Sequence, residues 1–271
     1  ENKFPSLMPD PPEPEVESTE LYPVRPAQGV CEVVVYTPEH NSSLAKQPVS
    51  QICKLMQVWQ DRFNDLSKHE SVEYVYIFEN KGEAVGVTLP HPHGQIYAYP
   101  FIPPRLGQKL KQCREHKLNT GKNLIASILQ EEKRHGQRIV AENGSFTALI
   151  PFFARYPFEL HIYPKIHAEA LTDFSFAQLR DLAEIFKQVL TAFDRLFDVS
   201  FPYIMSMNNR PSDGMDYEYF DFHVEFYPPM RTATKLKFLA GSEAGAGMFI
   251  NDTLPEEKAA ELRSLIEPVV W

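Results

Sequence analysis

The 271-residue sequence predicts an α+β protein in which two similar units each add strands to one antiparallel sheet flanked by helices. Two observations lead to this prediction. Strand-like runs and amphipathic helical stretches follow one another in the same order in both halves, and three polar landmarks recur at nearly constant spacing. The landmark pairs are His40 with His167, Asn80 with Asn208, and His91 with His223. In this alignment Glu225 occupies the position that His93 has in the first unit.

The first half opens with residues 1–28, which are rich in proline and glutamate. We expect an irregular arm here, because proline removes backbone donors and blocks helix formation. Apolar residues at three- and four-residue spacings predict a helix over 49–67, and residues 103–134 favour helix with an interruption near 119–121. Runs of β-branched and aromatic residues predict strands at 31–36, 72–78 and 94–99.

The second half repeats the alternation of strands with amphipathic helix. The same criteria predict helices over 175–197 and 255–264. Strands are predicted at 138–141, 146–151, 158–163, 202–207 and 219–227. We therefore divide the chain into an N-terminal unit, residues 1–135, and a C-terminal unit of the same kind, residues 136–271.

Composition excludes several classes of protein. The chain has 27 Lys and Arg against 36 Asp and Glu, a net charge of −9, which argues against binding nucleic acid through a general positive field. The longest apolar stretch, residues 146–154, is far too short to span a membrane. Cys31, Cys53 and Cys113 are odd in number and widely spaced, which favours a reducing compartment, the cytoplasm.

The chemistry-bearing residues concentrate between Phe78 and Gln95, in Phe-Glu-Asn-Lys-Gly and then Pro-His-Pro-His-Gly-Gln. Of the two histidines, one is expected to face a ligand cleft and the other to face inward, toward a metal or a structural partner. A neutral imidazole can attack phosphorus without prior deprotonation, which suits His93 to nucleophilic catalysis. Gln95 shares its face, and an amide can hold phosphoryl oxygens without activating water. The pattern therefore favours transfer of a phosphoryl group to a bound acceptor.

This segment resembles the active-site signature of class I galactose-1-phosphate uridylyltransferases, a branch of the histidine-triad superfamily. The resemblance extends over most of the chain. It also includes Asn2, Phe4 and Leu7, the run Tyr36–His40, the run Phe226–Pro229 and the run Lys237–Glu243. It implies two fused histidine-triad-like units, the second degenerate, in an antiparallel half-barrel, and a homodimer with active sites shared between subunits.

The resemblance also implies a two-step transfer. His93 would attack the α-phosphorus of UDP-glucose, form a covalent uridylyl-histidine and release glucose 1-phosphate. Galactose 1-phosphate would then take the uridylyl group and leave as UDP-galactose, while Gln95 holds the transferred group. Splitting one displacement into two gives each step oriented partners.

Further substrate contacts follow from the same resemblance. Asn2 and Asn80 match positions that contact the uridine nucleotide, and Thr88 keeps a hydroxyl for a phosphate oxygen. Lys237 and Glu243 match residues that reach the substrate phosphate and the hexose hydroxyls from the neighbouring subunit.

Two metal sites are implied as well. The structural zinc of the family would use His40 and His91 together with a Cys-x-x-Cys pair that would lie upstream of Glu1. A second metal would use Glu132 and His223, with Asn208 and Glu225 standing where the family has histidines. This second group could bind a metal weakly or form a hydrogen-bonded polar cluster, and we favour the cluster.

Two other functions remain open at this stage. Relatives that act on an ADP-sugar or on diadenosine polyphosphates, as phosphorylases, share the histidine–glutamine pattern. A protein of another class, a nucleotide-binding protein without catalytic activity, is the second alternative.

Overall fold

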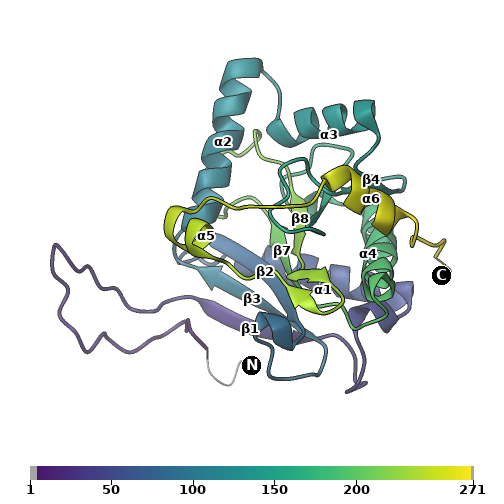
Figure 1. Ribbon diagram of the computed structural model, residues 1–271. Helices are drawn as coiled ribbons and strands as arrows, with labels where there is room; N and C mark the ends of the chain where they lie inside the picture. Colours follow the sequence, from purple (N-terminus) through teal and green to yellow (C-terminus); the bar gives the residue numbers. More distant parts are fainter. Residues whose placement is uncertain (1–4, 270–271) are drawn as a thin grey trace.

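A computed structural model describes residues 5–269 and has an eight-stranded antiparallel sheet at its centre (Figure 1). The sheet strands are β1 (Val30–Val35), β2 (Tyr74–Lys81), β3 (His93–Tyr99), β4 (Ile139–Glu142), β5 (Phe146–Leu149), β6 (Leu160–Pro164), β7 (Tyr203–Asn208) and β8 (His223–Tyr227). Their order across the sheet is β1-β3-β2-β7-β8-β6-β5-β4. The α+β class, with one large antiparallel sheet flanked by helices, is thereby confirmed.

The remaining elements surround this sheet. The helices are α1 (Val49–Leu66), α2 (Pro104–Thr120), α3 (Leu124–His135), α4 (Phe176–Leu196), α5 (Gly241–Ala246) and α6 (Pro255–Arg263). Single 3₁₀ turns are η1 (Leu44–Lys46), η2 (Glu83–Val85) and η3 (Leu171–Asp173), and β9 (Met230–Thr232) pairs with β10 (Lys235–Leu236) in a small hairpin. None of the helices formed by residues 5–269 has the length and apolarity needed to cross a membrane.

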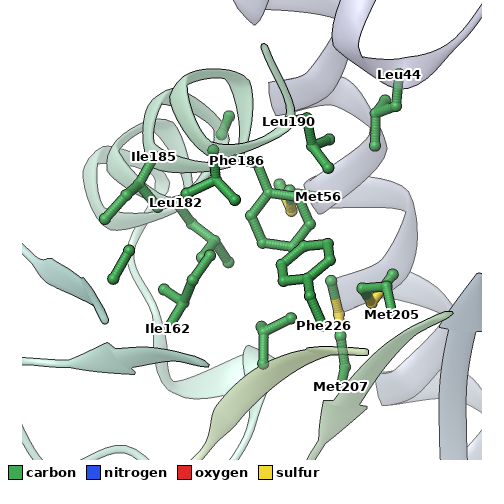
Figure 2. Packing of buried hydrophobic residues seen from close by; sticks show 14 of the residues in the cluster. Leu44, Met56, Ile162, Leu182, Ile185, Phe186, Leu190, Met205, Met207 and Phe226 are labelled. Atoms are coloured by element: carbon green, nitrogen blue, oxygen red, sulfur yellow. The ribbon is translucent and has the colours of Figure 1, made fainter. Parts of the chain in front are cut away.

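The main core lies between α1, α4 and one face of the sheet. Figure 2 shows Met56 of α1 and Phe186 of α4 converging on Phe226 of β8 and Met207 of β7. The rings of Phe186 and Phe226 are edge-to-face with centroids 5.4 Å apart. Burying an apolar side chain of this size stabilises the fold by roughly 1.5–3 kcal/mol. The amphipathic periodicity of α1 and α4 thus directs their apolar faces onto the sheet.

The opposite face of the sheet carries polar side chains. Alternate residues of each strand point away from the α1–α4 layer, among them His93 on β3 and His223 on β8. Helices α2 and α3 cover this face in the second half, where Leu110 and Cys113 pack with Phe220. The division of the chain after residue 135 stays a prediction, and the contacts of α2 and α3 are largely with the half that follows it.

The two halves have the same strand arrangement and meet at the β2–β7 pair. The order β1-β3-β2 in the first half is matched by β6-β8-β7 in the second, and α1 and α4 follow β1 and β6 along the chain. The registers of β2–β3 and β7–β8 can therefore be compared residue by residue.

The N-terminal arm is irregular, and three local elements differ from the expectation from the sequence. Residues 9–26 extend from the body as the loop at the left of Figure 1, and their ends meet where Met8 N donates to Ala27 O at 3.0 Å. The strand expected at 219–227 begins only at His223, because Phe222 N is already bonded to Ala168 O. Helix α5 and the β9–β10 hairpin were not expected from the sequence.

Candidate active site

Strand β3 positions His93 and Gln95 on the open face of the sheet. The strand alternates between partly exposed and buried residues, with Gly94 and Ile96 directed into the core. His93 lies opposite Val35 of β1, and Gln95 lies opposite both Val33 of β1 and Phe78 of β2. Both side chains therefore come from a strand with paired neighbours on each side, which fixes their backbone.

The hydrogen bonding of His93 determines which ring nitrogen is free. Its Nδ1 lies 2.8 Å from the carbonyl oxygen of His91. A carbonyl can only accept, so Nδ1 carries the proton and donates it there. The lone pair of the neutral ring is then on Nε2. This is the arrangement that an imidazole needs in order to act as a nucleophile.

Two adjoining cavities meet at His93. One, of about 220 Å³, is lined by Asn80, Thr88 and His93, with His91 at the same wall. The other, of about 350 Å³, is lined by Gln95 and again by His91 and His93. The structure thus brings four of the residues that the sequence singled out around one imidazole: Asn80, Thr88, His91 and Gln95.

His91 and His93 do not look in different directions, as the sequence analysis expected. Both rings line the same two cavities. Residues two apart on an extended chain share a face, so the strand geometry does not separate them. The two rings differ instead in their hydrogen-bond partners. His91 Nε2 donates to the Thr37 carbonyl at 2.7 Å, and its Nδ1 faces Nδ1 of His40 at 3.3 Å.

The His40–His91 pair fits one edge of a tetrahedral metal site. Two nitrogens bound to one zinc ion at about 2.0–2.1 Å lie roughly 3.3–3.4 Å apart. The Thr37 carbonyl fixes the proton on Nε2 of His91 and leaves Nδ1 as a potential ligand. Between residues 5 and 269, however, no three or more His, Cys, Asp or Glu side chains are grouped to hold a metal. The described residues therefore place two imidazole nitrogens where they could bind one ion, and the zinc site stays a prediction.

A buried carboxylate beneath the site was missed by the sequence analysis. Glu79 accepts hydrogen bonds from the hydroxyls of Tyr36, at 3.4 Å, and Tyr203, at 3.2 Å. Burial is the main cause that raises its pKa from 4.5 to about 7, and Lys81 and the two hydroxyls oppose it. The Tyr36 hydroxyl also lies 2.1 Å from where a Cβ on Gly94 would be. Glycine between His93 and Gln95 is thus what lets Tyr36 pass under β3.

Two expected substrate contacts, Lys237 and Glu243, do not meet His93 within residues 5–269. Lys237 and Glu243 pair with each other at 2.9 Å and line neither cavity. The hydrogen bond from Lys237 is the main reason that the pKa of Glu243 falls to about 2. Their approach to the site of a neighbouring subunit stays a prediction. Asn2 lies outside the described residues.

The second expected metal group has a different geometry. Glu132 on α3 is paired with Arg138, whose Nε lies 2.7 Å from its carboxylate. Among the other members stands the ammonium of Lys109, 2.9 Å from Asn208 Oδ1 and 2.5 Å from Glu225 Oε2. Asn208, His223 and Glu225 form a hydrogen-bonded polar cluster with Lys109, and Glu132 stands apart from it, so the arrangement does not fit the expected metal.

The strand registers also correct the internal alignment. Asn208 lies opposite His223. The β2–β3 register, carried two residues beyond the Phe78–Gln95 pair, puts Asn80 opposite His93. His223, not Glu225, is therefore the counterpart of His93, and Glu225 is the counterpart of Gln95.

The hydrogen bonds of the two histidines agree with this alignment. His223 Nδ1 donates to the carbonyl of Asp221, two residues earlier, at 2.9 Å, as His93 does to His91. The earlier alignment was wrong because it matched the two His-x-His/Glu runs by residue type, whereas strand register matches each histidine by the asparagine opposite it.

The second half contains a further buried network that no sequence motif indicated. Glu159 lies 2.5 Å from Arg155 and 2.9 Å from His161, and His161 also contacts the Tyr163 hydroxyl at 2.8 Å. Burial would raise the pKa of Glu159, but the bonds from His161 and Arg155 lower it overall. The alternation of His161 with Tyr163 along β6 was the one available signal that both face the same cluster.

Comparison with known proteins supports the same interpretation of this geometry. The family model described as galactose-1-phosphate uridyl transferase, N-terminal domain, matches residues 1–103, and that of the C-terminal domain matches residues 109–269. The galactose-1-phosphate uridylyltransferase of Thermotoga maritima is 45% identical over 264 residues, which cover 97% of this chain and 82% of the relative.

Solved structures are similar over most of the chain. A structure described as a uridylyltransferase superposes with a TM-score of 0.91 at 37% identity, covering 97% of this chain and 84% of that one. An ADP-glucose phosphorylase from Arabidopsis thaliana with bound ADP-glucose superposes with a TM-score of 0.80 at 25% identity, covering 89% and 74%. With both domain models and a relative of this identity in agreement, the chain belongs to the galactose-1-phosphate uridylyltransferase family.

Proposed function

We propose that this protein transfers UMP between UDP-glucose and galactose 1-phosphate and so acts in galactose metabolism. The observation that carries the proposal is the state of His93. Its Nδ1 is bonded to a backbone carbonyl, its Nε2 has no hydrogen-bond partner among residues 5–269, and the residue lines a cavity together with Asn80 and Thr88. The family membership supplies the substrates, since the relatives are named for this reaction.

In the first half-reaction, the Nε2 lone pair of His93 attacks the α-phosphorus of UDP-glucose. A nitrogen–phosphorus bond forms, and the bond from phosphorus to the glucose 1-phosphate oxygen breaks with its electron pair. The ring gains positive charge as this happens. The hydrogen bond from Nδ1 to the His91 carbonyl strengthens as that charge develops, which stabilises the uridylyl-histidine.

In the second half-reaction, a phosphate oxygen of galactose 1-phosphate attacks the same phosphorus. The nitrogen–phosphorus bond breaks, UDP-galactose forms, and His93 returns to the neutral ring. Gln95 lies on the same face of β3 and donates its amide to the transferred group. An amide neither accepts nor releases a proton near neutral pH. Gln95 therefore does not help water to take the uridylyl group in place of galactose 1-phosphate.

The remaining parts of the site complete the proposal. Lys237 and Glu243 reach the phosphate and the sugar of a substrate bound in the neighbouring subunit of a homodimer. His40 and His91 would supply two of the ligands of a zinc ion, which would have a structural role and would fix the chain where it enters β3. All three cysteines are free and buried, which favours a cytoplasmic protein.

The experiment is covalent labelling of His93. The protein is mixed with UDP-glucose, and the intact mass, the modified peptide and the released glucose 1-phosphate are measured. We expect one UMP on the peptide that contains His93, none in His93→Ala, and unchanged labelling in His69→Ala, a matched variant at an exposed histidine.

Parallel reactions separate the alternatives. Labelling by ADP-glucose or a diadenosine polyphosphate, and not by UDP-glucose, would replace the uridylyl assignment with that of a phosphorylase. Binding of UDP-glucose with no label on the protein and no exchange into glucose 1-phosphate would indicate a nucleotide-binding protein without activity.

A further inference from the structure

Lys109 is the residue on which the polar cluster of the second half converges. It projects from α2 toward β7 and β8, where its ammonium donates to Asn208 Oδ1 at 2.9 Å and to Glu225 Oε2 at 2.5 Å. The third neighbour is Nε2 of His223, at 3.4 Å. The side chain of Glu225 is 5% exposed and that of Lys109 is 22% exposed, so the ion pair is largely removed from water.

All three neighbouring atoms are of kinds that bind metal ions in proteins. An amide oxygen, a carboxylate oxygen and an imidazole nitrogen surround one point, and the proton on Nδ1 of His223 is fixed by the Asp221 carbonyl. The Nε2 lone pair therefore faces the ammonium, as it would face a metal ion. The distances from Nζ are those of hydrogen bonds, whereas zinc bonds to these atoms are about 2.0–2.2 Å long.

Charge balance in the cluster depends on Lys109. Burial alone would raise the pKa of Glu225, but Lys109, followed by His161 and His223, lowers it well below its usual value. Burial and then the nearby ammonium lower the pKa of His223. The Tyr227 hydroxyl also donates to the Glu225 carboxylate. One carboxylate and one ammonium thus neutralise each other, and a divalent ion in the same place would meet the positive charge of Lys109.

We infer that the ammonium of Lys109 is the resident cation of this cluster, that it excludes a divalent metal from the second half, and that its removal creates a metal site made of Asn208, His223 and Glu225. Glu132 is not part of that site, since it is held by Arg138. The inference concerns a part of the chain away from His93 and stands independently of the proposed reaction.

The test measures metal binding directly in the full-length protein. Wild type, Lys109→Met and Lys111→Met are freed of metal with a chelator and titrated with Co²⁺. Bound metal is counted by mass spectrometry, and visible absorption reports imidazole coordination. Methionine resembles the apolar stem of lysine up to Cε but lacks the charged nitrogen. Lys111 is the matched control, because it lies on the same helix with its side chain 70% exposed.

We expect Lys109→Met to bind one more equivalent of Co²⁺ than wild type and Lys111→Met, which should bind equally. Adding His223→Ala to Lys109→Met should remove this extra equivalent and its absorption band. No gain of metal in folded Lys109→Met would show that Asn208, His223 and Glu225 do not form a metal site. It would overturn the claim that removing Lys109 creates one.

Metal binding by the wild-type protein tests the claim that Lys109 excludes a divalent metal, even if Lys109→Met does not fold. Metal bound to wild type that is lost in His223→Ala would mean that the lysine does not exclude it. Lys109→Arg gives an additional check, since it keeps the positive charge and should gain no metal. A gain in that variant would contradict the role assigned to the charge.

Discussion

Replacing Glu79 by glutamine should remove a pH-dependent loss of stability from this protein. Glu79 is buried under the active site, with its two carboxylate oxygens bonded to the hydroxyls of Tyr36 and Tyr203. Glutamine has nearly the same shape and can keep a hydrogen bond to each hydroxyl, but it does not ionise. The substitution therefore isolates the ionisation of one carboxyl group.

The raised pKa of Glu79 determines whether the free energy of unfolding rises or falls with pH. Burial raises the pKa of Glu79 from 4.5 to about 7 in the folded protein. Below pH 4.5 the group is protonated in both states and contributes nothing. Between these two pH values the unfolded chain releases the proton and the folded chain keeps it, so the free energy of unfolding falls as pH rises. The full loss is present above pH 7, and at roughly 1.4 kcal/mol per pKa unit it amounts to about 3 kcal/mol.

The assay is urea unfolding of wild type and Glu79→Gln at pH 4.5, 6 and 8. We expect the stability of the variant relative to wild type to rise by about 3 kcal/mol between the first and the last pH. Glu83→Gln, at an exposed glutamate four residues away, should follow wild type at every pH. Parallel pH profiles for wild type and Glu79→Gln would refute the reasoning.

Two further predictions concern single packing and capping groups. Gly94→Ala should lower the free energy of unfolding by about 1–3 kcal/mol and impair transfer, because the new Cβ would lie 2.1 Å from the Tyr36 hydroxyl. Gly107→Ala, where the nearest atom is 3.9 Å away inside α2, should instead be neutral or stabilising, and urea unfolding of both tests the contrast. Ser175→Ala should lower the free energy of unfolding by about 1 kcal/mol, since Ser175 caps α4 by accepting from Gln178 N; an unchanged thermal midpoint would contradict this.

Local patterns in the sequence were enough to predict most of the helices and strands. Helices α1 and α4 carry apolar residues at helical spacing and bury them on the sheet, and the expected break in 103–134 falls at Gly121, between α2 and α3. The strand at 219–227 was predicted too long, because apolar alternation over Phe220 and Phe222 resembles a strand. Their backbone bonds instead go to Tyr217 and Ala168, which no local pattern reveals.

The site could be predicted only where its residues are close in sequence. His93 and Gln95 share a face because they are two apart on a strand, and this is readable from the chain. Glu79 meets Tyr36 and Tyr203 across separations of 43 and 124 residues, so their contact exists only in the folded protein. Lys109 reaches Glu225 across 116 residues for the same reason, and nothing beside it in the sequence marks it as different from Lys111.

The two halves then differ in one respect that bears on catalysis. Both place a histidine at the start of a matched strand, β3 or β8, opposite an asparagine, with Nδ1 bonded to the carbonyl two residues earlier. In the first half His93 lines two cavities, whereas in the second Nε2 of His223 faces the ammonium of Lys109 in a buried cluster. A lone pair that already accepts from Lys109 is not available to phosphorus. In the proposed mechanism, the presence of a histidine is therefore not enough to make a half catalytic, because its second nitrogen must also be left without a hydrogen-bond donor.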